Sequence, residues 1–280
     1  MKATASGAAR PCGPPAPPTD ASSVARIEDV YRSWFQAHAT VPEMEVHSTE
    51  ELTWMCGPGV GWSNAAVRVR LRGQRADAKL RAAISRAFTR GRGFGMWVSD
   101  LAEPADLGAR LTRLHFRKRK RFPGMLADLS RSTSPASLPG IAIEAVDDDA
   151  LFVRHPHPYF GRISTDLRRF EMRRLTHLVQ KRPQRVFHLV AMERQVPIGS
   201  ATLFVDGTTA AFYDVGVLEA ERGRGVGTYL MQAACSFAAE RGARAAVLLS
   251  SGMGYGVYLR AGFRDVCRIA YWYSKGDCSD

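Results

Sequence analysis

The residues of this chain best suited to chemistry are the glycines of a short loop, RGRGVG, from Arg222 to Gly227. Glycine leaves backbone N–H groups open to an anion, and the start of a following helix adds unpaired N–H donors and the positive end of its dipole. The strand before the loop reads AFYDVGVL, and the residues after it keep an apolar face at helical spacing as far as Gly242. Gly225 and Gly227 are therefore expected at the entry of a helix, with Arg222 and Arg224 beside a bound pyrophosphate.

A second copy of the same letters, RGRGFG, runs from Arg90 to Gly95 in the opposite context. An apolar helical face from Asp77 to Arg90 precedes it, and a strand from Gly95 to Ser99 follows. Gly91 or Gly93 then serves as a helix C-cap, and the carbonyl end of a helix repels phosphate. The sequence therefore predicts one phosphate loop, not two.

The residues beyond the Arg222–Gly227 loop make its pattern specific. A strand from Ala243 to Ser251 is followed by GMGYGVYLRAGF, in which Tyr258 stands four residues before the pair Gly262–Phe263. In this order the chain resembles the GNAT acyltransferase family over about Ile141 to Ser274. The matching positions are Val217, Arg222, Gly225, Gly227, Tyr258, Gly262 and Phe263.

The resemblance implies a mixed, splayed sheet that binds acyl-CoA, most commonly acetyl-CoA, and transfers its acyl group to an amine. The strand backbone at Val215, Gly216 and Val217 would meet the pantetheine arm and the thioester carbonyl. Tyr258 would stand near the sulfur. The remaining positions of the cofactor site would be Arg222, Gly223, Arg224, Gly225, Val226, Gly227, Thr228 and Ser251.

The identity of the general base is left open by the sequence. An alkylammonium has a pKa near ~10, so a group must remove its proton before attack. Relatives often carry a glutamate where this strand has Ala211 or Tyr213. Asp214 is a candidate base or acceptor-binding group, although strict strand alternation places it on the face opposite Tyr213 and Val215. Tyr258 is a candidate acid for the thiolate, or a half-buried aromatic with a solvated hydroxyl.

The acceptor side is expected to involve RHPHPYF, with His155, His157 and Tyr159, together with Tyr213 on the strand. His155 and His157 have the spacing of a metal pair, but no third ligand is apparent, so no metal is expected. A small-molecule amine is the favoured acceptor. A non-catalytic CoA-binding or scaffold protein, or transfer from an acidic acyl carrier protein, are the alternatives.

The net charge of +12 suggests polyanionic partners, but 33 arginines against 6 lysines also reflect a compositional bias. The run RKRKR, Arg117 to Arg121, favours a strand with solvated charges over a nucleic-acid site. Five cysteines without a C-x-x-C pair indicate neither a disulfide framework nor a zinc site, and fit a reducing, cytoplasmic setting. No apolar run is long enough for a membrane helix, and the oligomeric state is not readable.

We expect an α/β (α+β) fold with two GNAT-like domains, each a mixed central sheet flanked by helices. Residues 1–24 form a Pro/Ala-rich tail predicted to be disordered, and residues 131–140 form a linker rich in Ser and Pro. Residues 25–130 resemble the degenerate first half of tandem GNAT proteins, with His115 where glycine is usual. Residues 141–280 form the acyl-CoA-binding domain.

Overall fold

The computed structural model describes residues 20–58, 64–88, 93–130, 135, 137–146 and 164–275. Its strands form one mixed sheet in the order β1-β2-β3-β4-β11-β5-β10-β9-β8-β7-β6. The strands are β1 (Glu45–Ser48), β2 (Thr53–Cys56), β3 (Ala65–Val67), β4 (Phe94–Val98), β5 (Arg117–Asp128), β6 (Ile141–Val146), β7 (Val186–Glu193), β8 (Val196–Asp206), β9 (Thr209–Val217), β10 (Ala245–Leu249) and β11 (Arg264–Ser274). The helices are α1 (Ala21–Ala37), η1 (His38–Thr40), α2 (Ala76–Phe88), α3 (Leu107–Arg113), α5 (Thr165–Lys181), η3 (Glu219–Glu221), α6 (Val226–Glu240) and α7 (Tyr255–Arg260).

The two halves of the chain share this sheet. The C-terminal strand β11 lies between β4 and β5, and β5 continues the sheet into β10. The predicted α/β class with a mixed sheet is therefore confirmed. The division into two domains at residues 131–140 stays a prediction, and strand β11 crosses it by pairing with strands from the first half.

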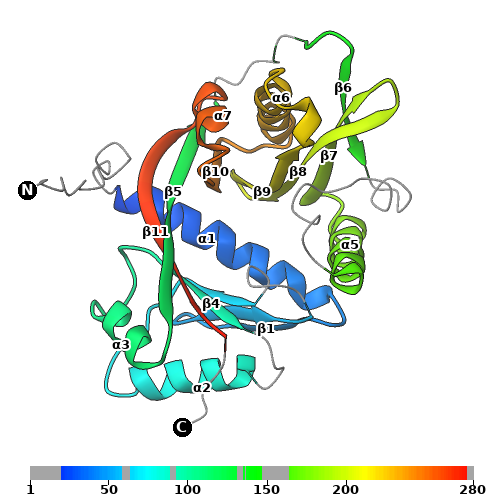
Figure 1. The fold of residues 1–280 in the computed structure, drawn as a ribbon. Coiled ribbons are helices and arrows are strands. Elements are labelled where there is room, and N and C mark those ends of the chain that lie inside the picture. Colours follow the sequence, from blue (N-terminus) through cyan, green and yellow to red (C-terminus); the bar gives the residue numbers. More distant parts are fainter. Residues whose placement is uncertain are drawn as a thin grey trace, which may run out of the picture.

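Helix α1 lies between the two halves in Figure 1, with β1 and α2 on one side and β9 and α5 on the other. Its apolar face, which includes Ile27, Tyr31 and Trp34, joins a core shared with residues of α5, β9 and β11. The opposite face of the C-terminal sheet is covered by α6, whose Leu230 and Ala234 are fully buried. Residues of α2 and α3 form a further core with β2 and β4.

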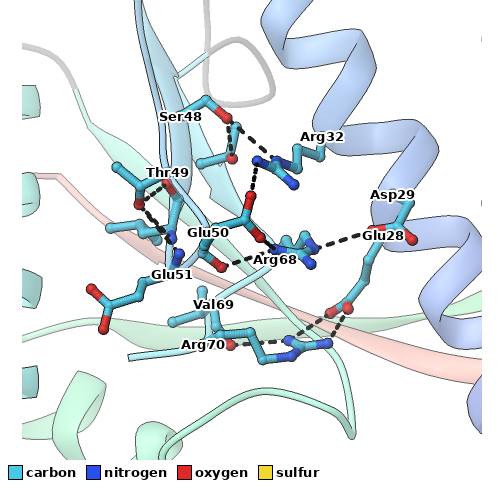
Figure 2. A network of polar contacts seen from close by, with 12 residues as sticks. Glu28, Asp29, Arg32, Ser48, Thr49, Glu50, Glu51, Arg68, Val69 and Arg70 are labelled. Atoms are coloured by element: carbon cyan, nitrogen blue, oxygen red, sulfur yellow. Dashed lines mark hydrogen bonds and ion pairs between the residues drawn. The ribbon is translucent and has the colours of Figure 1, made fainter. Parts of the chain in front are cut away.

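Polar side chains of α1 bind residues near β2 and β3 in the first half of the chain, as Figure 2 shows. Glu28 forms a largely buried ion pair with Arg70 and accepts a 2.6 Å hydrogen bond from the Ser99 hydroxyl. Arg32 pairs with Glu50 at 3.2 Å. The helix therefore presents charges to one half of the chain and aromatic rings to the other.

Most predicted elements are present, with two differences. Strands β1 and β2 were not predicted, because each is only four residues long and lacks a clear alternation. Helix α1 begins at Ala21, inside the tail that was expected to be disordered, because the Asp20 carboxylate caps it by accepting from the Ser22 N–H at 3.0 Å. Residues 1–19 lie outside the described residues. No helix in the described part of the chain is long and apolar enough to cross a membrane.

Candidate functional site

Strands β9 and β10 diverge at the centre of the C-terminal sheet. They pair in parallel from Thr209 and Ala245 to Ala211 and Val247, and no further. β9 continues to Val217 with only β8 beside it in the described structure. The edge of β9 that faces the split therefore offers backbone groups to a ligand, as an open strand edge does.

A β-bulge interrupts β9 inside this split. Tyr213 pairs with Thr202 and Gly216 pairs with Ser200, so two residues of β9 oppose the single residue Ala201. Asp214, in the bulge, has a φ of 51°, which aspartate adopts at a lower cost than most residues. The bulge breaks the strict alternation on which the predicted orientation of Asp214 depended. Bulges commonly re-aim a side chain next to functional sites.

The RGRGVG loop has the predicted order of strand, loop and helix. Gly223 and Gly225 have φ values of 81° and 86°, and open space surrounds the position that a Cβ would occupy on each. Gly225 is the N-cap of α6 and supplies no side-chain hydrogen bond to the first turn. The first N–H groups of α6 therefore stay without a partner inside the helix, which suits an anion.

The two loop arginines differ in their surroundings. Arg222 is exposed and donates from Nε to the carbonyl oxygen of Val217 at 3.2 Å. Arg224 donates to Glu193 at 2.6 and 3.0 Å and also pairs with Glu221. These hydrogen bonds raise the pKa of Arg224 and lower that of the Glu193 carboxyl. The charge of Arg224 is therefore partly neutralised by carboxylates in this structure.

Tyr258 lies on α7 with only 7% of its surface exposed. A Cβ on Gly254 would lie 3.1 Å from its hydroxyl, so the absence of a side chain at Gly254 makes room for this phenol. The ring of Tyr258 packs at an edge angle on Phe263, with centroids 6.0 Å apart. The Ser251 hydroxyl accepts from the Gly254 N–H at 3.1 Å and so shapes the same turn.

Tyr213 is enclosed by aromatic residues of α1, which the sequence did not connect to the site. Its ring stacks on Trp34, with centroids 4.6 Å apart and planes 15° apart, and tilts against Tyr31 at 5.1 Å. The Tyr213 hydroxyl is buried and has no hydrogen-bond partner among the described residues. The spacing of Ile27, Tyr31 and Trp34 is typical of a buried helix face, but no sequence signal indicates which strand this face covers.

Burial sets the protonation of these two phenols. It raises the pKa of Tyr31 and of Tyr213, and in both cases the negative charge of Asp214 raises it further. A hydrogen bond from the Leu249 backbone opposes part of the increase for Tyr31. Both phenols are therefore protonated at neutral pH, so they can donate hydrogen bonds but cannot act as bases.

A buried network of His38, Arg174 and Glu171 lies beside the aromatic cluster. The Nδ1 of His38 donates to the carbonyl oxygen of Trp34 at 2.8 Å, so its Nε2 accepts from Arg174 at 2.6 Å. Arg174 donates in turn to Glu171 at 2.7 Å. Burial, together with the Arg174 charge, lowers the pKa of His38 to about 3. His38 is therefore neutral and fully engaged, which holds α5 against the end of α1.

The first half of the chain contains a structural counterpart of the glycine loop, but not at RGRGFG. It is the segment Arg70 to Arg75, which follows β3 and precedes α2, with Gly73 at a φ of 75°. Leu71 and Arg75 stand where Gly223 and Gly227 stand in the other loop. In Figure 2, Arg70 turns inward to Glu28. In the RGRGFG copy, Arg90, Gly91 and Arg92 lie outside the described residues, and Phe94 and Gly95 begin β4. The helix α2 before this copy and the strand β4 after it have the order that the sequence predicts.

Three predicted acceptor residues, His155, His157 and Tyr159, lie outside the described residues. Within the residues that the structure describes, no group of three His, Cys, Asp or Glu side chains could hold a metal ion. Tyr213 and Asp214 lie on β9, and the loop glycines follow the end of this strand. Tyr31 and Trp34 join them from α1.

Comparison with known proteins agrees with this geometry. A family model described as the acetyltransferase (GNAT) family matches residues 150–263. No curated protein matches the chain in sequence.

Solved structures share the fold across most of the chain. A GCN5-related N-acetyltransferase from Kribbella flavida is 16% identical, with a TM-score of 0.64 over 88% of this chain and 95% of its own. One from Sphaerobacter thermophilus is 18% identical, with a TM-score of 0.58 over 89% and 91%. A tandem GNAT protein from the clavulanic acid biosynthesis pathway is 16% identical, with a TM-score of 0.59 over 91% and 97%. Likeness at these identities concerns the fold.

Proposed function

Since residues 150–263 match a model of the acetyltransferase (GNAT) family, we propose that the chain transfers an acetyl group from acetyl-CoA to the amine of a small molecule. One observation carries this proposal: the glycine loop at the start of α6, with Gly223 and Gly225 at positive φ, follows the open edge of β9 after one short turn. A pyrophosphate fits the first feature and an extended pantetheine arm fits the second.

The residues of the split then have distinct roles. The N–H groups from Arg222 to Thr228 hold the pyrophosphate, and Val215, Gly216 and Val217 align the arm along β9. A backbone N–H of β9 near Val217 donates to the thioester oxygen, where negative charge develops during attack. Acetyl-CoA supplies the activated acyl group when bound.

Proton transfer falls to Asp214 and Tyr258. Tyr31 and Tyr213 hold their protons because their pKa values are raised, and both ring nitrogens of His38 are engaged. Asp214 lies in the bulge of β9, and we assign its carboxylate the role of accepting the proton of the amine directly or through one water. Tyr258 donates a hydrogen bond to the departing thiolate.

Paired glycine substitutions test the loop. Gly225→Glu and Gly73→Glu each place the same side chain on a glycine of positive φ with open space around it, one in each half. Both variants carry a similar backbone strain, of about 1 kcal/mol. Only Gly225→Glu is expected to abolish acetyl-CoA binding in calorimetry and thiol release with amines, because it puts a carboxylate at the phosphate position.

Gly73→Glu is the control and is expected to bind acetyl-CoA as wild type does. If Gly225→Glu bound acetyl-CoA as wild type does, the loop would not be the cofactor site. If wild type bound acetyl-CoA but released no thiol with any amine tried, the non-catalytic alternative would replace the proposal.

A further inference from the structure

The run Arg117 to Arg121 opens into a pocket that the proposed reaction does not use. A cavity of about 670 Å³ lies where α3, the start of β5 and the end of β11 meet. Its lining includes His115, Arg117, Arg119, Tyr273 and Lys275, and we call these five residues the basic pocket. None of the lining residues is acidic. The volume falls within the range of small-molecule sites, which hold roughly 300–1,000 Å³.

The arginines of the basic pocket are not neutralised by carboxylates in the part of the chain that the structure describes. No ion pair involves Arg117 or Arg119, whereas Arg121 of the same strand pairs with Asp100 at 3.6 Å. Arg119 is instead held over the ring of Tyr273, 5.7 Å from its centroid. Its guanidinium is therefore positioned by an aromatic face and keeps its donors available for an anion.

The backbone of β5 is irregular at this point. Lys118 lies opposite Trp272 and Lys120 lies opposite Tyr271, so Arg119 is an extra residue that forms a β-bulge. A bulge changes the direction in which neighbouring side chains leave the strand. Arg119 thereby reaches the same aromatic residue, Tyr273, that faces Arg117 across the strand pair.

His115 adds a second irregularity. It ends α3 with a φ of 59°, as Gly262 ends α7 with a φ of 92° at the equivalent place in the second half. Glycine is the residue that adopts this conformation without a steric cost, whereas an exposed histidine gains no packing from it. The side chain of His115 lines the basic pocket.

The basic pocket is remote from the proposed cofactor loop. β11 starts beside α7, which packs on α6, and its far end forms part of the pocket. Eleven residues of strand span on the order of 30 Å. Figure 1 shows α3 at the opposite end of the molecule from α6 and α7.

We propose that the basic pocket binds a small ligand carrying at least two phosphate charges, at a site separate from the acetyl-CoA loop. Two guanidinium groups, an ammonium and an imidazole around one cavity match the charge and the hydrogen-bond acceptors of a diphosphate. A nucleic acid is disfavoured, because Lys118 lies against Trp272 and Arg121 pairs with Asp100, which leaves no continuous basic stripe. This inference does not depend on the proposed transferase activity.

The test is calorimetric titration of the full chain with inorganic pyrophosphate. Wild type is expected to show two sites, the loop and the basic pocket, and Gly225→Glu is expected to keep only the second. In that background, Arg117→Gln with Arg119→Gln is expected to weaken the remaining site by about ten-fold or more, because it removes two charged hydrogen-bond donors. Lys118→Gln with Arg121→Gln is the matched control, with the same loss of charge from the same strand.

A second variant separates binding from folding. His115→Gly in the Gly225→Glu background is expected to weaken pyrophosphate binding while its melting temperature stays equal or rises, because glycine suits the left-handed conformation. Equal affinity in all variants, or an equal loss in the matched control, would overturn the proposal. The proposal would also be overturned if citrate bound as tightly as pyrophosphate. It would likewise be overturned if a single-stranded oligonucleotide bound to the protein and both double substitutions weakened that binding equally.

Discussion

Tyr31 of α1 and Tyr213 of β9 lie with ring centroids 5.1 Å apart and planes tilted by 60°. One residue comes from the first half of the chain and the other from the strand of the proposed acetyl-CoA site. Tyr31 is buried, and Tyr213 is partly buried with its hydroxyl enclosed. The backbone of Leu249 hydrogen bonds to Tyr31, whereas the hydroxyl of Tyr213 has no partner among the described residues. The first half of the chain therefore contributes to the surroundings of the proposed acetyl-CoA site.

This difference predicts opposite effects of two similar substitutions. Tyr213→Phe removes a buried hydroxyl without a partner, whose desolvation costs on the order of 1–3 kcal/mol, so the free energy of unfolding is expected to rise. Tyr31→Phe removes a bonded hydroxyl and is expected to lower it by about 1 kcal/mol. Denaturant unfolding measures both values. If Tyr213→Phe had a lower free energy of unfolding than Tyr31→Phe, the Tyr213 hydroxyl of the wild type would have a hydrogen-bond partner beyond the described residues.

Turnover of Tyr213→Phe gives a separate prediction. If the Tyr213 hydroxyl donates to the acceptor or the thioester, kcat/KM is expected to fall by up to about ten-fold, the value of one neutral hydrogen bond. Acetyl-CoA affinity in calorimetry is expected to stay unchanged. A variant with wild-type kcat/KM would limit Tyr213 to a packing role.

Substitutions of Asp214 separate its carboxylate from its backbone conformation. Asp214→Asn and Asp214→Gly both tolerate a φ of 51°, so both are expected to keep the melting temperature. Asp214→Ala is expected to lose about 1 kcal/mol of stability, because alanine is strained there. If the carboxylate is the base, thiol release falls by about 100-fold or more in all three variants. Equal turnover in wild type and Asp214→Asn would exclude that role.

The pairing of Arg224 predicts a gain of affinity. Glu193→Gln removes a carboxylate that binds Arg224, so the arginine becomes more available to phosphate. The dissociation constant for acetyl-CoA is expected to decrease several-fold. Glu240→Gln, which removes an exposed charge at the far end of α6, is the control and is expected to change nothing. Weaker binding by Glu193→Gln would show that the ion pair orders the loop.

His38 predicts a pH dependence of stability. Its pKa is lowered to about 3 in the folded state, against about 6.5 when unfolded, so the unfolded chain binds the extra proton between these values. Stability is therefore complete above pH 6.5 and decreases as the pH falls toward 3. Between pH 6.5 and 5 the loss is about 2 kcal/mol.

His38→Gln isolates this effect. A glutamine can still accept from Arg174 but does not titrate, so its unfolding free energy is expected to vary less between pH 7 and 5 than that of wild type. Chemical denaturation at both values measures the difference. Equal pH dependence in the two proteins would mean that His38 is protonated within the fold.

The sequence by itself determined the features that depend on neighbouring residues. The helix after Gly225 follows from an apolar spacing of 3.6 residues, and the strand before Arg222 follows from a short run of mostly apolar residues. The hairpin between β8 and β9 follows from Gly207, which has a φ of 56°. The order of these elements also distinguished the RGRGVG loop from the RGRGFG copy, because strand, loop and helix are local in the chain.

Only the tertiary structure decided the relationships between distant segments. The bulge at Asp214 depends on the register of β9 against β8, and the insertion of β11 between β4 and β5 depends on pairing across the whole chain. The contact of Tyr31 with Tyr213 and the pairing of Arg224 with Glu193 likewise join separate elements. Local propensities and periodicity carry no information about which buried faces meet, because that choice is made by packing and by the satisfaction of charges in the folded chain.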